Sequence, residues 1–143
     1  MHSFVADSNI LFTFFWEGSA LSGVMEQGAK IYAPAFFLEE LRKHQDEITR
    51  KAGLDKSGFQ TKKRELEVKI EIVGQKEYSS QLKAFEMHLE NLPEDIAREI
   101  IEDEDFAALA IRQKCPLWSN DRLLKKQKLV PVLDTREIIE LLG

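Results

Sequence analysis

The stretch that decides the fold is Phe4-Val5-Ala6-Asp7-Ser8-Asn9-Ile10-Leu11-Phe12. Its apolar start breaks at Asp7-Ser8-Asn9, after which helix-compatible apolar residues resume. This pattern predicts a buried strand whose carboxyl end delivers Asp7 into a turn that leads to a helix. Because open parallel α/β sheets place their chemistry at the carboxyl ends of the strands, Asp7 is the first candidate functional residue.

Apolar runs and helical periodicity alternate along the rest of the chain. Further strands are expected at 31–33, 70–73, 117–119 and 130–133, the last at a sheet edge because it contains a proline. Helices are expected at 9–16, 19–28, 35–52, 55–68, 78–92, 102–114 and 134–142, with short ones after Pro93 and at Leu123-Leu124. This order predicts one doubly wound α/β domain over residues 1–143, with a parallel sheet.

Cysteine content and hydropathy narrow the class of protein. The single cysteine, Cys115, can form neither an intramolecular disulfide nor a thiol-based zinc site, which suits a reducing compartment. The apolar residues 10–16 are too few to span a membrane, and no Lys or Arg precedes them. We therefore expect a cytoplasmic protein without a membrane partner.

Charge is distributed unevenly along the chain. The formal net charge of -5 argues against a general nucleic-acid coat protein. Residues 42–64 nevertheless carry eight Lys and Arg against three acids, whereas residues 86–105 carry nine acids against one Arg. One part of the surface can thus hold a polyanion while another part gathers cations.

Two expected strands are followed by acids, Asp7 after the first and Asp121 after 117–119. Each alone is explained equally well as the N-cap of a helix. If the two strands are neighbours at the point where the strand order reverses, both carboxylates overhang the same crevice. The recurrence of the acid at equivalent places favours the crevice.

Acids also open two of the expected helices. The helix that follows residues 31–33 carries Glu39 and Glu40 in its first turns, and either can reach Asp7 and Asp121, although the helix dipole alone favours acids there. Glu40 lies beside the apolar stripe of this helix, while Glu39 points further round. In the helix expected at 102–114, Asp103 shares the inward face, which leaves Asp105 as a weaker alternative.

Such a set of carboxylates requires a cation. Two unit charges about 4 Å apart repel by roughly 4 kcal/mol at an effective dielectric constant near 20. Oxygen ligands without Cys or His favour hard ions, Mg²⁺ or Mn²⁺, which keep several water ligands. Such ions can direct a water molecule at a phosphodiester and stabilise the leaving oxygen.

These residues resemble the PIN domain nucleases. The resemblance rests on Val5-Ala6-Asp7-Ser8-Asn9, Pro34 with Leu38-Glu39-Glu40-Leu41, Asp103 ahead of Phe106-Ala107-Ala108-Leu109-Ala110, and Trp118-Ser119-Asn120-Asp121. The motifs occur in the family's order and cover nearly the whole chain. The resemblance places the family's four acids on Asp7, Glu40, Asp103 and Asp121, with Asn9 and Ser119 as supporting polar residues.

The resemblance also implies an architecture and an activity. The fold would be a three-layer α/β/α sandwich with about five parallel strands, and the activity would be Mg²⁺- or Mn²⁺-dependent endonucleolytic cleavage of single-stranded RNA. Small prokaryotic members are often dimers and toxins bound by an antitoxin protein, while others process RNA. The alternative is a catalytically weak PIN-fold scaffold that binds RNA or a protein, which the intact acidic set disfavours. A receiver-type phosphoacceptor domain is disfavoured because Asp7 stands alone after the first strand.

The remaining residues with chemical potential are expected to serve the structure. His2, His44 and His88 lack ligand spacing and are assigned to surface or packing positions. Trp16 and Trp118 are expected in the core rather than as platforms for base stacking. The basic residues after Asp121 are interpreted as a solvated helix face at least as readily as an RNA contact.

Overall fold

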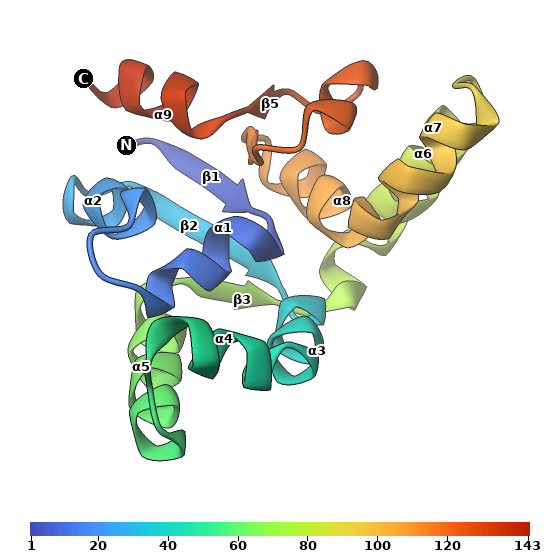
Figure 1. Ribbon diagram of the computed structural model, residues 1–143. Helices are drawn as coiled ribbons and strands as arrows, with labels where there is room; N and C mark the ends of the chain where they lie inside the picture. The colour runs from blue at the N-terminus through green and yellow to red at the C-terminus, as the bar shows by residue number, and fades with distance from the viewer.

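A parallel five-stranded sheet runs through the computed structural model, which describes residues 1–143 (Figure 1). Its strands are β1 Ser3–Ala6, β2 Lys30–Pro34, β3 Glu71–Val73, β4 Leu117–Trp118 and β5 Val132–Leu133. The strand order is β3-β2-β1-β4-β5, so β2 and β3 lie on one side of β1 and the later strands β4 and β5 lie on the other. The order therefore reverses between β1 and β4, the two strands that precede Asp7 and Asp121, and the expected doubly wound sheet is confirmed.

Helices connect the strands and cover the sheet. The α-helices are α1 Ser8–Phe12, α2 Ala20–Glu26, α3 Phe36–Lys43, α4 Gln45–Ala52, α5 Lys56–Lys69, α6 Ser79–Leu89, α7 Glu94–Ile100, α8 Glu104–Gln113 and α9 Thr135–Leu142. Short 3₁₀ helices are η1 Thr13–Phe15, η2 Gln75–Tyr78, η3 Ile101–Asp103 and η4 Arg122–Lys126. The expected strand at 130–133 is shorter than predicted and lies at the sheet edge as β5.

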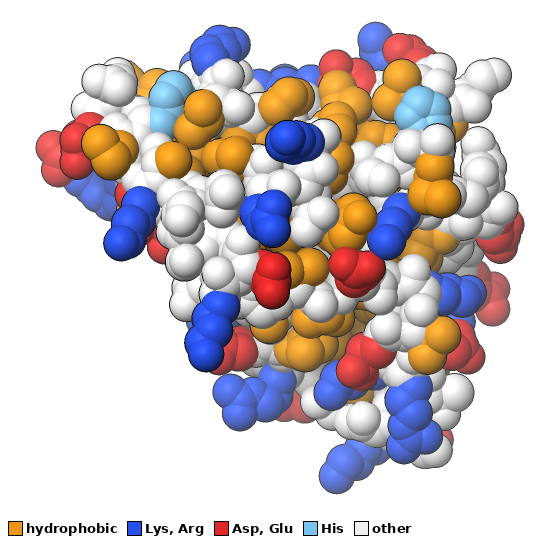
Figure 2. All heavy atoms as spheres, turned by 180° about the vertical axis from the view of Figure 1, so that it is seen from behind, with side chains coloured by type: hydrophobic (Ala, Val, Ile, Leu, Met, Phe, Trp, Pro, Cys, Tyr) orange, Lys and Arg blue, Asp and Glu red, His pale blue; other side chains and the backbone are white.

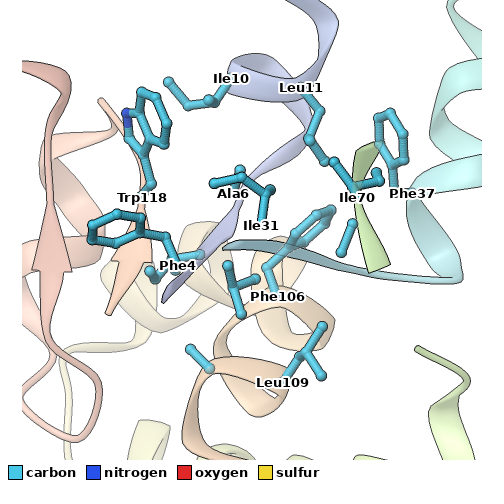
Figure 3. Packing of buried hydrophobic residues seen from close by; sticks show 14 of the residues in the cluster. Phe4, Ala6, Ile10, Leu11, Ile31, Phe37, Ile70, Phe106, Leu109 and Trp118 are labelled. Atoms are coloured by element: carbon cyan, nitrogen blue, oxygen red, sulfur yellow. The ribbon is translucent and has the colours of Figure 1, made fainter. Parts of the chain in front are cut away.

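Apolar side chains fill the space on both faces of the sheet. Figure 3 shows Ile10 and Leu11 of α1 on one face and Phe106 and Leu109 of α8 on the other. These side chains belong to one cluster of 34 buried hydrophobic residues. Two apolar faces covered by helices make β1 a fully buried central strand, as its uninterrupted apolar run predicts, and they confirm the α/β/α layers.

Local signals fix several helix ends. Gly53 ends α4 in the left-handed conformation with φ of +66°, which a glycine adopts at little cost. Asp134 caps α9 and forms a reciprocal capping box with Glu137. Asp55 caps α5 by accepting a hydrogen bond of 2.6 Å from the Gly58 amide.

The single helix expected over 35–52 is wrong. The chain forms α3 and α4, which are separated at His44, whose φ of -101° and ψ of 10° lie outside the helical range. Neither a proline nor a glycine marks the break. The change of direction, visible in Figure 1, accompanies burial of Phe37 and Leu41 from α3 and of Ile48 from α4. Tertiary packing therefore overrides a helical sequence at this point.

The helix expected over 102–114 begins differently from the prediction. Residues Ile101–Asp103 form the 3₁₀ turn η3, and Asp103 occupies the N-cap position of α8. Its side chain makes no capping hydrogen bond. The Asp103 carboxylate is therefore free to face another part of the molecule.

Surface charge follows the uneven distribution seen in the sequence. In the view from behind, Lys and Arg side chains crowd the lower end of the molecule, which is the region of α5 (Figure 2). Among all the helices, none combines the length and the apolar character that crossing a bilayer requires.

Candidate active site

A cleft of about 220 Å³ is lined by acids that come from separate segments of the chain. We call it the acid cleft; its lining residues are Asp7, Ser8, Asn9, Phe12, Glu40, His44, Glu102, Asp103 and Asp121. The four acids singled out in the sequence thus meet in one cleft, and Asn9 lies beside them. This arrangement follows from the strand order, because β1 and β4 are neighbours and end at the same edge of the sheet.

Asp7 lies at the inner end of the acid cleft and is 5% exposed. One of its carboxylate oxygens accepts a hydrogen bond of 2.9 Å from the Ile10 amide, so Asp7 also caps α1. Burial raises the pKa of Asp7, and the negative charge of Asp121 adds to this effect. Hydrogen bonding from Ser119 and from the amides of Ile10 and Asn9 acts in the opposite direction. Asp7 is therefore both a cap and a carboxylate whose ionised form a nearby cation would favour.

Asp121 and Ser119 follow β4. Asp121 is exposed, and its carboxylate accepts a hydrogen bond of 3.0 Å from the Leu123 amide. Its own amide donates to the Ser119 hydroxyl over 3.1 Å. Ser119 is 1% exposed, and its hydroxyl lies between the Asp121 backbone and the Asp7 carboxylate. Ser119 thus contacts both strand-end residues, Asp7 and Asp121.

Asp103 experiences the combined field of the acid cleft. Burial raises its pKa from the usual 3.8 to about 7, with further contributions from the negative charges of Asp7, Asp121, Glu102 and Glu40. Three of these four neighbours are the other acids predicted from the sequence. The negative charges of Asp7, Asp121 and Glu40 therefore all act on the Asp103 carboxylate, as expected for four acids in one site.

Glu40 reaches the cleft from α3 and lies beside His44. The Glu40 carboxylate is 3.9 Å from the Nε2 atom of His44, and the Nδ1 atom of the same ring is 3.6 Å from the Glu47 carboxylate. The break between α3 and α4 therefore places an imidazole between an acid of the cleft and an acid outside it.

Two other acids considered in the sequence lie elsewhere. Asp105 accepts a hydrogen bond of 2.7 Å from the Tyr78 hydroxyl. Together with Glu39 it lines a different cleft of about 230 Å³, next to Gln75. The structure therefore does not bring the alternative ligand Asp105 to Asp7, because its side chain is directed toward η2.

Four residues that line the acid cleft were not predicted from the sequence, namely Ser8, Phe12, His44 and Glu102. His44 was assigned to the surface or to packing, although its spacing of four residues from Glu40 was an available signal. Glu102 could not be found from helix periodicity, because it lies in the 3₁₀ turn before α8. The Ser8 hydroxyl is buried and has no hydrogen-bond partner, and nothing in the sequence indicates this.

The donor set fits a hydrated hard cation better than a closed metal cage. No group of three or more His, Cys, Asp or Glu side chains is arranged to hold an ion directly. Mg²⁺ is usually held by one or two carboxylates and keeps several waters, so a preformed cage is not required. Carboxylate oxygens and the unpartnered Ser8 hydroxyl offer acceptors to such waters, a set of oxygen donors that fits a hard divalent cation.

The fold and the acid cleft together define a doubly wound α/β domain with an acidic site at its topological switch point. The chain belongs to the PIN domain family, since a family model described as a PIN domain matches residues 5–141. PIN domains are nucleases as a family and generally use divalent metal ions. The resemblance seen in the sequence motifs is thereby confirmed.

A solved structure supports the same fold. The crystal structure of VapBC2 from Rickettsia felis bound to a DNA fragment from their promoter contains a chain that is similar to this protein, with a TM-score of 0.63. The sequence identity is 14%, and the alignment covers 92% of this chain and 98% of the other. No match was found among curated proteins.

Proposed function

We propose that this protein is a Mg²⁺- or Mn²⁺-dependent endoribonuclease that hydrolyses phosphodiester bonds in single-stranded RNA. The observation that carries the proposal is the convergence of Asp7, Glu40, Asp103 and Asp121 on one cleft at the switch point of the sheet. These acids come from four separate segments, so helix capping alone does not account for their meeting. Membership of the PIN domain family supports hydrolysis of a nucleic acid.

The chain's residues divide into ligands and supports. Asp7, Glu40, Asp103 and Asp121 would hold the ion, either directly or through its waters. Ser119 would keep Asp7 and Asp121 in register by its contacts to both, and Asn9 would orient a water or a phosphate oxygen at the rim. When bound, the ion supplies positive charge that activates a water for in-line attack and stabilises the leaving oxygen. The products would carry 5′-phosphate and 3′-hydroxyl ends.

A cleavage assay with end mapping tests this proposal. Wild-type protein should cleave single-stranded RNA in Mn²⁺ or Mg²⁺ and remain inactive in EDTA. Asp7→Asn keeps the size of the side chain and the oxygen that caps α1, so it should fold but lose cleavage by at least about a hundredfold. Equal cleavage by wild type and Asp7→Asn would refute the assignment. Tight RNA binding without product would indicate the scaffold alternative.

We further propose an antitoxin partner and a homodimer. The fold similarity to a chain of the VapBC2 complex supports a role as the toxin of a toxin–antitoxin pair, and RNA processing is the competing role. Induced expression should arrest growth of a bacterial host, whereas Asp7→Asn should not. Light scattering of the purified protein tests the dimer, and a monomer at micromolar concentration would exclude it.

A further inference from the structure

A second cleft of about 330 Å³ adjoins the acid cleft. We call it the aromatic cleft; its lining residues are Asn9, Phe12, Trp16, His44, Glu47, Ile48 and Lys51. Asn9, Phe12 and His44 line both clefts. A nucleic-acid strand with one phosphate at the carboxylates of the acid cleft can therefore place an adjoining nucleotide in the aromatic cleft.

Aromatic rings and one aliphatic side chain form the apolar walls. The ring of Phe12 is half-buried, and its centroid lies 5.5 Å from that of His44. Trp16 packs against the hydrophobic core, as expected, but it is only half-buried, whereas Trp118 is completely buried. Ile48 is 3% exposed and lies at the base. Partly exposed aromatic rings beside a nucleic-acid site are the surfaces on which unstacked bases pack.

Hydrogen-bond donors and hydrogen-bond acceptors both lie at the edge of the same cleft. The Lys51 ammonium is 3.0 Å from the Glu47 carboxylate, which keeps Glu47 ionised by lowering its pKa. Asn9 adds an amide that donates and accepts. A planar ring with donors and acceptors on its edge would satisfy these groups, whereas an aliphatic side chain would not.

Charge around the aromatic cleft favours a polyanion. α4, which borders the cleft, and the first part of α5 belong to the segment 42–64 with its excess of Lys and Arg. Those side chains crowd one end of the molecule in Figure 2. An RNA strand leaving the acid cleft would thus meet positive charge, which binds phosphates irrespective of sequence.

We propose that the aromatic cleft binds the base of a nucleotide adjoining the cleaved phosphodiester, by stacking on Phe12 and Trp16 and hydrogen bonding to Glu47 and Lys51. This inference rests on the proposed ribonuclease function and assigns a specificity-determining subsite to it. The break at His44 is then the feature that separates the base from the carboxylates of the acid cleft, because the imidazole lies between Glu40 and Glu47.

Tryptophan fluorescence provides a readout that does not depend on cleavage. Trp118 is inaccessible and donates a hydrogen bond of 3.0 Å to Thr135, so quenching by an added base reports Trp16. The probes are four homopolymeric ribopentamers and an abasic pentamer of the same charge, mixed by stopped flow in Mg²⁺ and separately in EDTA. We expect saturable quenching by at least one base-containing pentamer, none by the abasic chain, and loss of the signal in Trp16→Phe.

Matched variants locate the contact. Phe12→Leu and Lys51→Ala should each weaken the affinity for the best pentamer by about tenfold, the size expected for one lost stacking or charged contact. Lys83→Ala removes an exposed lysine of α6 that lies outside the aromatic cleft and outside the basic segment 42–64, and it should bind as wild type does. If Phe12→Leu fails to fold, as seen by circular dichroism, Lys51→Ala against Lys83→Ala decides.

The outcomes separate this inference from the proposed function. Equal quenching by the abasic pentamer would overturn the nucleobase assignment, because the cleft would then hold only phosphates. Absence of quenching by every pentamer, in a protein that still cleaves RNA, would also overturn it and would leave the cleft as a contact for a protein segment. Quenching without cleavage would sustain the base subsite while refuting the nuclease.

Discussion

Replacement of Asp103 by Asn removes a carboxylate whose ionised form is disfavoured by burial and by the neighbouring acids of the acid cleft. The pKa of Asp103 is raised from 3.8 to about 7 by burial and by the surrounding carboxylates. The folded protein therefore keeps the Asp103 proton over a pH range in which the unfolded chain has lost it. Between about pH 4 and pH 7 the unfolded state binds fewer protons, so metal-free stability should fall as the pH rises. Above about pH 7 both states are ionised and the decline should end.

The magnitude follows from the pKa difference. Three pH units at about 1.36 kcal/mol each set a ceiling of roughly 4 kcal/mol. Asp121 is exposed, and Glu40 and Asp103 are only partly buried, so relaxation and solvent screening reduce this value. We expect Asp103→Asn to be about 1–2 kcal/mol more stable than wild type at pH 8 in EDTA. No capping hydrogen bond is lost, because the Asp103 side chain makes none.

Urea unfolding at pH 4.5 and pH 8, with and without Mg²⁺ or Mn²⁺, provides the measurement. The advantage of Asp103→Asn should be small at pH 4.5 and should shrink when metal is added at pH 8, because the ion stabilises the folded wild type. Glu99→Gln removes an exposed acid of α7 and controls for net charge. If the difference between wild type and Asp103→Asn is the same at both pH values in EDTA, the carboxylates do not share a field and the reasoning fails.

Three further predictions concern other residues of the structure. Asp7→Asn should be neutral or stabilising without metal, and Mg²⁺ or Mn²⁺ should raise its melting temperature less than that of wild type; an equal metal response would speak against a shared site. Asp105→Asn should retain cleavage within a few-fold, because Asp105 faces Tyr78 rather than the acid cleft, and a loss as large as that of Asp7→Asn would restore it as a ligand candidate. Gln127→Ala should lower the free energy of unfolding, measured in urea, by roughly 2–4 kcal/mol. The buried side-chain amide of Gln127 forms hydrogen bonds of 2.8–2.9 Å with the backbone of Leu124 and Val130, and these backbone groups would lose their partners. A cost below about 0.5 kcal/mol would show that water replaces the amide.

The sheet and its acids were predictable because their signals are local. The apolar run before Asp7 and the shorter run before Asp121 each end in a turn, and the alternation of strands with helices leaves few topologies. Helical periodicity favours Glu40 over Glu39 and Asp103 over Asp105, and the resemblance to the PIN domain nucleases assigns the four acids. Asp103 lies in the 3₁₀ turn before α8, so its place in the cleft does not follow from the helix face used to predict it.

The features that were missed depend on packing between segments distant in sequence. The break at His44 has no proline or glycine to announce it, and it is visible only once Ile48 is seen buried. Glu102 joins the acid cleft because η3 is a 3₁₀ turn, in which helical-wheel positions do not apply. Trp16 packs against the core as expected, but hydropathy alone does not show that this residue also lines a cleft.

The strand order also bears on when the site can exist. β4 pairs with β1, so Asp121 reaches Asp7 only after the chain through β4 has been synthesised and folded. Contacts so distant in sequence form late, because the intervening chain must first lose its freedom. A nascent chain that has folded only as far as β3 has Asp7 and Glu40 but not the partners that complete the cleft. The topology thus makes the assembly of the acid cleft depend on the pairing of β4 with β1.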